Sequence, residues 1–181
     1  MKQTPFSLLS FALFTLFIAA GLSGDVKAQF AQAQLLSSNA GNLTVDRAPD
    51  RDLEHNVLDL INKQRVENNL PPLAWNHQVA EIARLHSRDM GWNNYFNHRG
   101  LDGKMVSDRA ETSGIEWHMI GENIAMLGGF SDPIDHVVEG WMQSPGHRKN
   151  ILDPRWKETG IGIFITANGT YYFTQVFLCK D

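Results

Sequence analysis

Two stretches near the C-terminus place the strongest limit on the fold. Residues 161–167 and 170–178 are rich in β-branched and aromatic side chains, and Asn168-Gly169 separates them. Such stretches around an Asn-Gly pair predict a β-hairpin with a two-residue type I′ turn. This turn would place Ala167 opposite Thr170.

The predicted pairing leaves apolar side chains on both faces of the hairpin. One face would carry Ile161, Ile163, Ile165, Tyr172, Thr174 and Val176, and the other would carry Phe164 and Phe173. A sheet that is apolar on both sides needs cover on both sides, and helices are the cover that this chain offers. We therefore expect an α+β fold: a three-layer α-β-α sandwich whose small, mainly antiparallel sheet lies between two layers of helices. A third strand is expected at residues 120–126.

Apolar residues at helical spacing predict the covering helices. They indicate helices at residues 52–69, from Asn76 to Met90, at 104–112 and at 132–144. Pro145 ends the last of these, because proline disfavours helical geometry at the residue before it.

His86 falls on the apolar face of the second predicted helix. We interpret this single histidine as a hydrogen-bonded core residue and not as a ligand, because buried polar groups usually have hydrogen-bond partners.

The N-terminus has the pattern of an export signal. Lys2 precedes an apolar run over residues 6–22, and Val26-Lys27-Ala28 offers small residues where a signal peptidase cleaves. We expect a signal peptide at residues 1–28, with a second possible cleavage after Ala33. The alternative is an uncleaved anchor, although the run is at the short limit for spanning a bilayer and contains Ser and Thr.

Export gives the expected domain organisation and location. Residues 29–51 are predicted to be a flexible leader and residues 52–181 the folded domain. We expect a secreted protein, extracellular or periplasmic, without a stable membrane anchor. Cys179 is the only cysteine, so an intrachain disulfide is excluded. The net charge of −4 gives no sign of a nucleic-acid partner. We expect a monomer.

Two histidines and one glutamate occupy loop-like positions, where side chains can converge on one site. His98 follows Asn97, Glu122 lies in Gly121-Glu122-Asn123-Ile124-Ala125, and His147 follows Ser144-Pro145-Gly146.

These motifs resemble those of the CAP superfamily, which groups cysteine-rich secretory proteins, venom antigen 5 and class 1 plant pathogenesis-related proteins. The chain is most similar to the bacterial SCP-domain branch, over about residues 54–179. Four motifs occur in the family's order: Phe96-Asn97-His98, the Glu122 segment, Trp141 followed by Ser144-Pro145-Gly146-His147, and Gly160-Ile161-Gly162. The resemblance also implies an α-β-α sandwich.

The resemblance implies a cleft with two histidines and two glutamates. The histidines correspond to His98 and His147, and the first glutamate corresponds to Glu122. Ser144 occupies the place of the second glutamate, so activities that need both carboxylates are in doubt. We include Ser144 and Asn123 as residues lining the cleft.

His98, Glu122 and His147 are a sufficient donor set for Zn²⁺ or another divalent cation. The alternative interpretation is a buried polar network in which Glu122 orients one histidine.

Two functions remain open. The first is an extracellular binding or signalling module for a lipid, a peptide or a cell-surface component, with no catalytic residues. The second is a metal-dependent hydrolase, peptidase-like, with Glu122 as general base. A Ser144–His147 hydrolase is disfavoured because the sequence lacks a Gly-x-Ser-x-Gly elbow.

Overall fold

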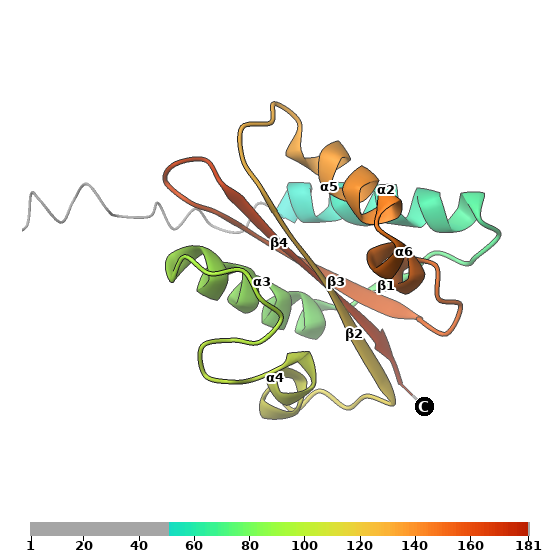
Figure 1. Cartoon of the computed structure of the whole chain (residues 1–181). Coiled ribbons are helices and arrows are strands. Elements are labelled where there is room, and N and C mark those ends of the chain that lie inside the picture. Colours follow the sequence, from blue (N-terminus) through green and yellow to red (C-terminus); the bar gives the residue numbers. More distant parts are fainter. Residues whose placement is uncertain (1–50, 181) are drawn as a thin grey trace, which may run out of the picture. The chain divides into compact units, whose positions relative to one another are not determined.

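The computed structural model describes residues 51–180, which form five helices and a four-stranded sheet (Figure 1). The elements are α2 (Arg51–Glu67), β1 (Ala74–Trp75), α3 (His77–Trp92), α4 (Val106–Thr112), β2 (Met119–Leu127), α5 (Pro133–Gln143), α6 (Pro145–Ile151), β3 (Glu158–Ile165) and β4 (Tyr171–Cys179). The predicted signal peptide and the predicted leader, apart from its last residue, lie outside the described residues. No helix within residues 51–180 is long and apolar enough to cross a bilayer.

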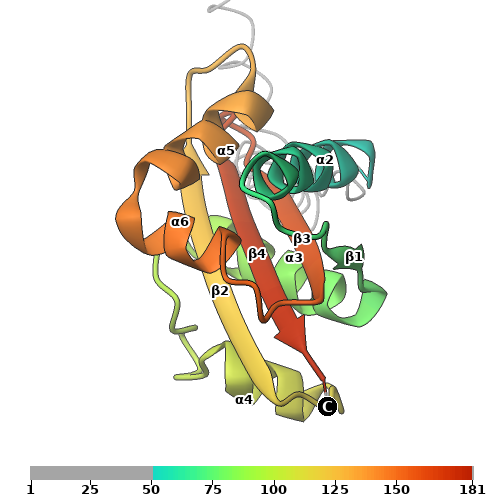
Figure 2. The same ribbon diagram turned by 90° about the vertical axis from the view of Figure 1, so that its right-hand side faces the viewer.

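The sheet has the strand order β1-β3-β4-β2. The hairpin partners β3 and β4 are antiparallel, as are β4 and β2, whereas the two-residue strand β1 is parallel to β3. Helices α3 and α4 lie on one face, and α2, α5 and α6 lie on the other (Figures 1 and 2). This arrangement confirms the predicted α-β-α sandwich with its mainly antiparallel sheet.

Two glycines allow α3 to lie directly on the sheet. A Cβ atom on Gly160 would overlap the backbone of Ala80, and one on Gly162 would overlap the backbone of Arg84. Helix α3 therefore contacts β3 backbone to backbone, because only glycine leaves room for such an approach.

Large side chains fill the opposite face of the sheet. Their cluster includes Val57, Ile61, Val137, Trp141, Ile151, Trp156, Ile161, Ile163, Phe173 and Phe177. These residues come from α2, α5, α6, the two hairpin strands and, for Trp156, the segment between α6 and β3, so burial of this cluster holds the second helical layer on the sheet.

The hairpin register differs from the predicted one by one residue. Ile165 pairs with Tyr171, and Thr166 and Thr170 close a three-residue loop in which only Gly169 has a positive φ, +81°. A type I′ turn needs positive φ at both central residues, and Asn168 does not adopt it. The slip exchanges the faces of β4, so Phe173 joins the large apolar cluster and Val176 faces α3.

The predicted helices are confirmed, with small changes at their ends. Helix α3 begins after Asn76, whose side chain accepts hydrogen bonds from the backbone N–H groups of Gln78 and Val79. Helix α4 begins at Val106 instead of residue 104. Pro145 occupies the first turn of α6, which places His147 in that same turn.

Candidate functional site

Strand β2 is an outer strand of the sheet, and it projects Glu122 and Asn123 to opposite faces. The Glu122 side chain contacts His98 and Arg109 beside α4, whereas the Asn123 side chain contacts Asn150 of α6. Two adjacent residues of one strand therefore contribute to two different polar networks.

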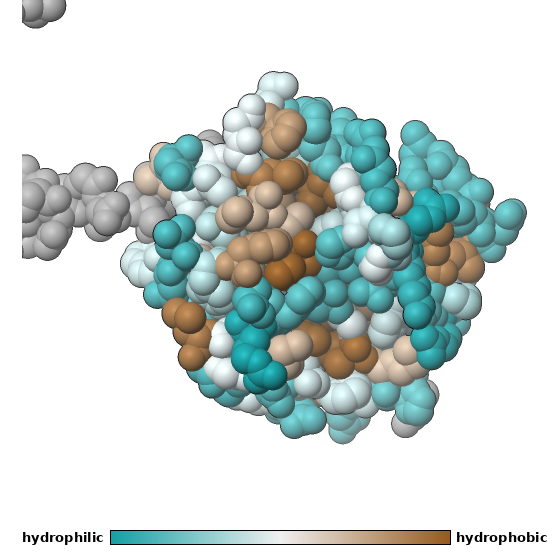
Figure 3. All heavy atoms as spheres, in the orientation of Figure 1, coloured by the Kyte–Doolittle hydropathy of each residue, from teal (hydrophilic) through white to brown (hydrophobic). Residues whose placement is uncertain are grey.

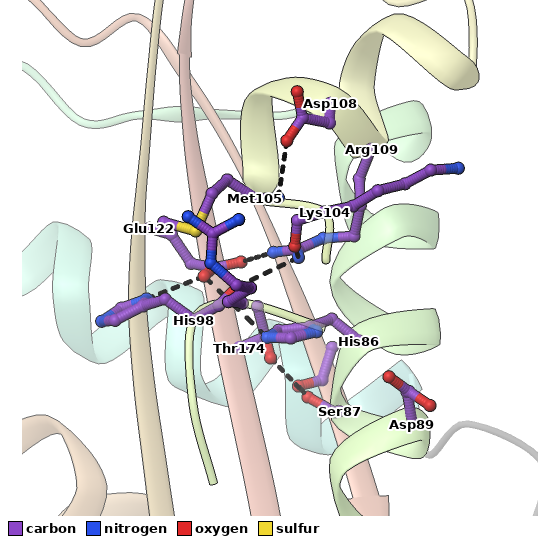
Figure 4. A network of polar contacts seen from close by, with 12 residues as sticks. His86, Ser87, Asp89, His98, Lys104, Met105, Asp108, Arg109, Glu122 and Thr174 are labelled. Atoms are coloured by element: carbon purple, nitrogen blue, oxygen red, sulfur yellow. Dashed lines mark hydrogen bonds and ion pairs between the residues drawn. The ribbon is translucent and has the colours of Figure 1, made fainter. Parts of the chain in front are cut away.

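The first network surrounds the Glu122 carboxylate (Figure 4). Nδ1 of His98 donates to Oε1 at 2.8 Å, and Nη2 of Arg109 forms an ion pair with Oε2. Nη1 of Arg109 also donates to the carbonyl oxygens of His98 (3.2 Å) and Lys104 (3.1 Å). The Glu122 side chain is only 3% exposed, and Arg109 supplies the positive charge that a buried carboxylate requires.

His86 lies beneath this network. Its Nε2 is 3.0 Å from the carbonyl oxygen of Asn97 and 4.0 Å from Oε1 of Glu122. Burial lowers the pKa of the His86 imidazole, and Glu122 partly opposes that shift. The core position predicted for His86 is confirmed, since the residue is buried and hydrogen-bonded. Its proximity to Glu122 was not predicted.

His147 belongs to the other helical layer. The residue is half-buried, and its Nδ1 atom is fully buried with no hydrogen-bond partner in the described part of the chain. Burial lowers the pKa of His147, and the charge of a protonated His98 lowers this pKa further. The two imidazoles are therefore close enough to influence each other electrostatically, although they come from opposite layers.

The second network fixes α5 and α6 against β2. Nδ2 of Asn150 donates to Oδ1 of Asn123 at 2.9 Å and to the Glu122 carbonyl at 3.3 Å, while Nε1 of Trp141 donates to the Ile124 carbonyl at 3.2 Å. Asn123 also donates to the carbonyl of His147 at 3.4 Å. Asn123 is fully buried, so it supports the helix that carries His147 instead of lining a cleft. Half-buried Ser144 lies where α5 and α6 meet.

The three predicted metal ligands are not assembled around one point. Within residues 51–180, no group of three or more His, Cys, Asp and Glu side chains has an arrangement that could hold a metal ion. Both Glu122 oxygens are already engaged, Oε1 by His98 and Oε2 by Arg109. A carboxylate bonded to Nδ1 of a histidine is the usual support for a ring that binds metal through Nε2. The arrangement thus suits Glu122 as an orienting group better than as a ligand.

The structure also has a groove away from these residues. It measures about 440 Å³ between α2, α5 and α6, and it contains none of the predicted site residues. Its apolar lining comes from Leu60, Val138 and Met142, and charged side chains of both signs stand around them.

The sequence motifs did not indicate Arg109. It lies on the short helix α4, and no local spacing connects it with Glu122 on β2. A buried carboxylate predicts that a cation lies nearby, but only the fold shows which cation it is.

Comparison with known proteins identifies the family. The model of the cysteine-rich secretory protein family, CAP, matches residues 58–177. The chain therefore belongs to the CAP family, and it is of the bacterial SCP type.

Three relatives illustrate the match. The "uncharacterized membrane protein YlbC" of Bacillus subtilis is 38% identical over 125 residues, which are 69% of this chain and 34% of that protein. An extracellular SCP-domain protein from Bacillus anthracis is 35% identical, with a TM-score of 0.64 over 72% of this chain and 41% of the other. An outer surface protein of Borrelia burgdorferi shares the fold at 18% identity, with a TM-score of 0.66 over 77% and 99% of the two chains. The chain spans less than half the length of the curated relatives it matches.

Proposed function

We propose that this protein is an exported binding module that takes a divalent metal ion between the imidazoles of His98 and His147. In this proposal Glu122 orients His98, and water completes the coordination of the ion. Zn²⁺ is the preferred candidate, because imidazole nitrogen is among its favoured ligands.

The observation that carries the proposal is the unpartnered Nδ1 of His147. A buried ring nitrogen without a hydrogen bond is uncommon, and a bound ion or an ordered water would satisfy it. The lowered pKa of His147 favours the neutral imidazole, the form that binds a metal. His98 remains 43% exposed, so an ion from solvent can reach it.

Exposed apolar side chains in the His98 loop, on β2 and after β2 support an organic ligand with an apolar part, such as a lipid or a peptide. Phe96, Met126 and Phe130 are 45%, 47% and 46% exposed, and an apolar patch covers the part of β2 nearest α5 (Figure 3). Phe96 lies two residues before His98, and Met126 lies on the same strand as Glu122. Exposed apolar patches of this kind commonly mark binding surfaces.

A hydrolase with Glu122 as general base receives less support from the geometry. A base must accept a proton from a water molecule beside the metal, yet both Glu122 oxygens already accept from His98 and Arg109. Binding therefore remains the preferred function.

Titration calorimetry with Zn²⁺ tests the metal site. We expect the mature domain to bind one ion and the His98→Ala/His147→Ala variant to lose that binding. His77→Ala/His136→Ala is the matched control, because it removes two exposed imidazoles elsewhere and should leave the isotherm unchanged. Equal binding by the wild-type protein and the His98/His147 variant would show that these imidazoles do not hold the ion.

Export is tested by expressing the full chain in a bacterium and determining the mass of the protein outside the cytoplasm. We expect cleavage after Ala28, with Ala33 as the alternative site. The names of two similar structures, an extracellular protein and an outer surface protein, support this location. A protein that keeps residues 1–28 and remains with the membrane fraction would favour the anchor.

A further inference from the structure

The outer side of α3 carries a single row of exposed side chains. Apart from His77 at the start of the helix, all exposed residues of α3 belong to this row, which consists of Gln78, Glu81, Leu85, Arg88 and Trp92. The steps between them alternate between three and four residues. This is the a/d spacing that lines the contact between two helices packed side by side. We call these five residues the α3 row.

The α3 row contains two large apolar side chains and stands on a fixed helix. Leu85 and Trp92 are 52% and 53% exposed. The opposite side of α3 packs on β3 and β4, where Gly160 and Gly162 bring backbone against backbone (Figures 1 and 2). A helix held in this way loses little conformational freedom when a partner docks on it, which favours association.

The order of charges along the α3 row selects the partner. Glu81 lies four residues before Leu85 and Arg88 lies three residues after it, which is about 6 and 4.5 Å along the helix axis. We propose that a second copy of this chain docks on the α3 row, antiparallel, with a two-fold axis at Leu85. Glu81 of each copy then lies opposite the partner's Arg88, to within about 1.5 Å along the axis. Trp92 lies opposite the partner's Gln78 in the same way.

The antiparallel arrangement is the one in which the α3 row is complementary to itself. Contacts across a two-fold axis are reciprocal, so one acidic and one basic residue in each copy give two pairs of opposite charge. A parallel pair would place Glu81 against Glu81 and Arg88 against Arg88, and like charges brought together oppose association. The signs of the charges therefore determine the direction of the pair as well as the partner.

Contacts within one copy leave the charged side chains accessible to a partner. Glu81 is 3.1 Å from Arg84, yet its side chain is 61% exposed, and Arg84 has its closer partner in the buried Glu54 at 2.7 Å. The guanidinium of Arg88 lies 5.7 Å from the centre of the Trp92 ring. Arginine can stack on an aromatic ring and donate to a carboxylate at the same time, so Arg88 can keep this contact when it pairs with the partner's Glu81.

The α3 row predicts a weak dimer and disfavours a lipid surface. The row is about 21 Å long, and a contact of one helix pair is smaller than the interfaces of permanent dimers. Association should therefore depend on concentration, in contrast to the monomer expected from the sequence. A lipid surface would bury the Glu81 carboxylate beside Leu85 without a cation, whereas a second copy supplies a guanidinium for it.

Sedimentation equilibrium of the exported protein measures the association. We expect the average mass to rise toward that of a dimer as the concentration approaches about 1 mM. Glu81→Arg and Arg88→Glu should each weaken association about tenfold or more, because each places like charges opposite each other twice. Asp59→Arg and Lys149→Glu are the matched controls, since they make the same charge changes at exposed positions outside α3. Both controls should stay within about twofold of the wild-type association constant.

A mixture of the two charge variants gives the sharpest test. In a mixed dimer each contact again joins an acidic and a basic side chain, so Glu81→Arg and Arg88→Glu should associate with each other although neither associates with itself. The double variant Glu81→Arg/Arg88→Glu should regain association close to the wild-type value. Both positions are exposed, and circular dichroism checks that every variant is folded.

The inference is overturned if the wild-type protein stays monomeric up to about 1 mM, or if the single charge variants associate as well as it does. It is also overturned if the mixture does not associate. A monomer that co-sediments with phosphatidylglycerol vesicles, and that no longer does so after Leu85→Asp, would assign the α3 row to a membrane surface instead. The inference is independent of the proposed metal site, so His98→Ala/His147→Ala should associate as the wild-type protein does.

Discussion

The two faces of the sheet are built in different ways. On the α3 face, Gly160 and Gly162 bring backbone against backbone, and the polar groups beside β2 are the charged side chains Glu122 and Arg109. On the α5 and α6 face, large side chains fill the space, and the polar groups beside β2 are neutral amides and an indole. A close backbone contact tolerates little displacement, so this layer is rigid where α3 crosses β3. A core of side chains adapts more easily and carries neutral hydrogen bonds.

This difference explains how the candidate site is divided. His98 depends on the charged network, whereas His147 depends on the amide network and on α6. Both histidines are tied to β2, the outer strand of the sheet: His98 through the Glu122 side chain, and His147 through its carbonyl oxygen and the Asn123 side chain. A substitution on one face should therefore affect the histidine of that face first. The loss of stability should be larger where the substituted residue makes a backbone or charged contact than where it makes a neutral hydrogen bond.

The largest effect is expected from Gly162→Ala. The added Cβ would overlap the backbone of Arg84, which cannot move without lifting α3 from the sheet. We expect a loss of more than about 3 kcal/mol in the free energy of unfolding, at or beyond the upper range for overpacking. Urea denaturation followed by circular dichroism measures it. Gly140→Ala, in α5 with nothing near its Cβ position, should be neutral or should stabilise by up to about 1 kcal/mol. Similar losses in both variants would contradict the backbone contact.

Glu122→Gln tests the charged network. It leaves the Arg109 guanidinium without its carboxylate, and we expect the free energy of unfolding to fall by about 3 kcal/mol. Urea denaturation again provides the measurement. Glu139→Gln removes the same charge from an exposed helical position and should change stability by less than about 0.5 kcal/mol. A loss below about 1 kcal/mol for Glu122→Gln would mean that the cluster is solvated and that the contrast between the faces is wrong.

Asn150→Ala tests the neutral network. Oδ1 of Asn123 and the carbonyl of Glu122 would lose their donor, so we expect a loss of about 1–2 kcal/mol. Asn150→Asp keeps the volume but removes the donor, and it should cost at least as much. Chemical denaturation of both variants, with the side-chain amide resonances of Asn123 followed by NMR, is the measurement. The contrast is refuted if Asn150→Asp is as stable as the wild-type protein.

The smallest effect is expected from an exposed ion pair. Arg155, whose side chain is 63% exposed, lowers the pKa of the Asp153 carboxyl below its ordinary 3.8 through a charged hydrogen bond. We expect Arg155→Ala to have the smallest effect of the four variants on the free energy of unfolding at neutral pH, as measured by urea denaturation. A carboxyl with a lowered pKa stabilises the fold above its ordinary pKa and loses this contribution as the pH falls. The small difference between the variant and the wild-type protein should therefore shrink as the pH falls below about 3.8, and vanish once the pH is below the lowered pKa of Asp153. A difference that grows in acid would contradict this assignment.

Local patterns were sufficient to predict most elements of the fold. The side chain of Asn76 starts α3, and Pro133 stands in the first turn of α5, because capping and proline geometry act within a few residues. Apolar residues on both sides of the hairpin required two helical layers, and the structure confirms them. The hairpin register was predicted wrongly. An Asn-Gly pair is compatible with more than one turn, and packing of Phe173 and Phe177 against the large cluster goes with the three-residue loop.

The candidate site, too, was predictable from the sequence only in part. The sequence motifs indicated His98, Glu122 and His147. All three lie within residues 58–177, which match the family model. They gave no sign that Glu122 and Asn123 point to opposite layers with different partners, since that depends on the neighbours of each face. They also did not reveal Arg109 or the place of His86, because these residues reach Glu122 from helices whose approach is set by long-range packing.

The sequence by itself determined the helices, the strands, the two-sided apolar hairpin and the family motifs, because each depends on residue types at short range. Tertiary structure decided the register of β4, the pairing of Glu122 with Arg109 and the attachment of His98 and His147 to β2 from opposite layers. These features depend on which surfaces are buried together and on which cation the fold places next to the buried carboxylate. Such choices depend on contacts between distant segments, and no local spacing encodes them.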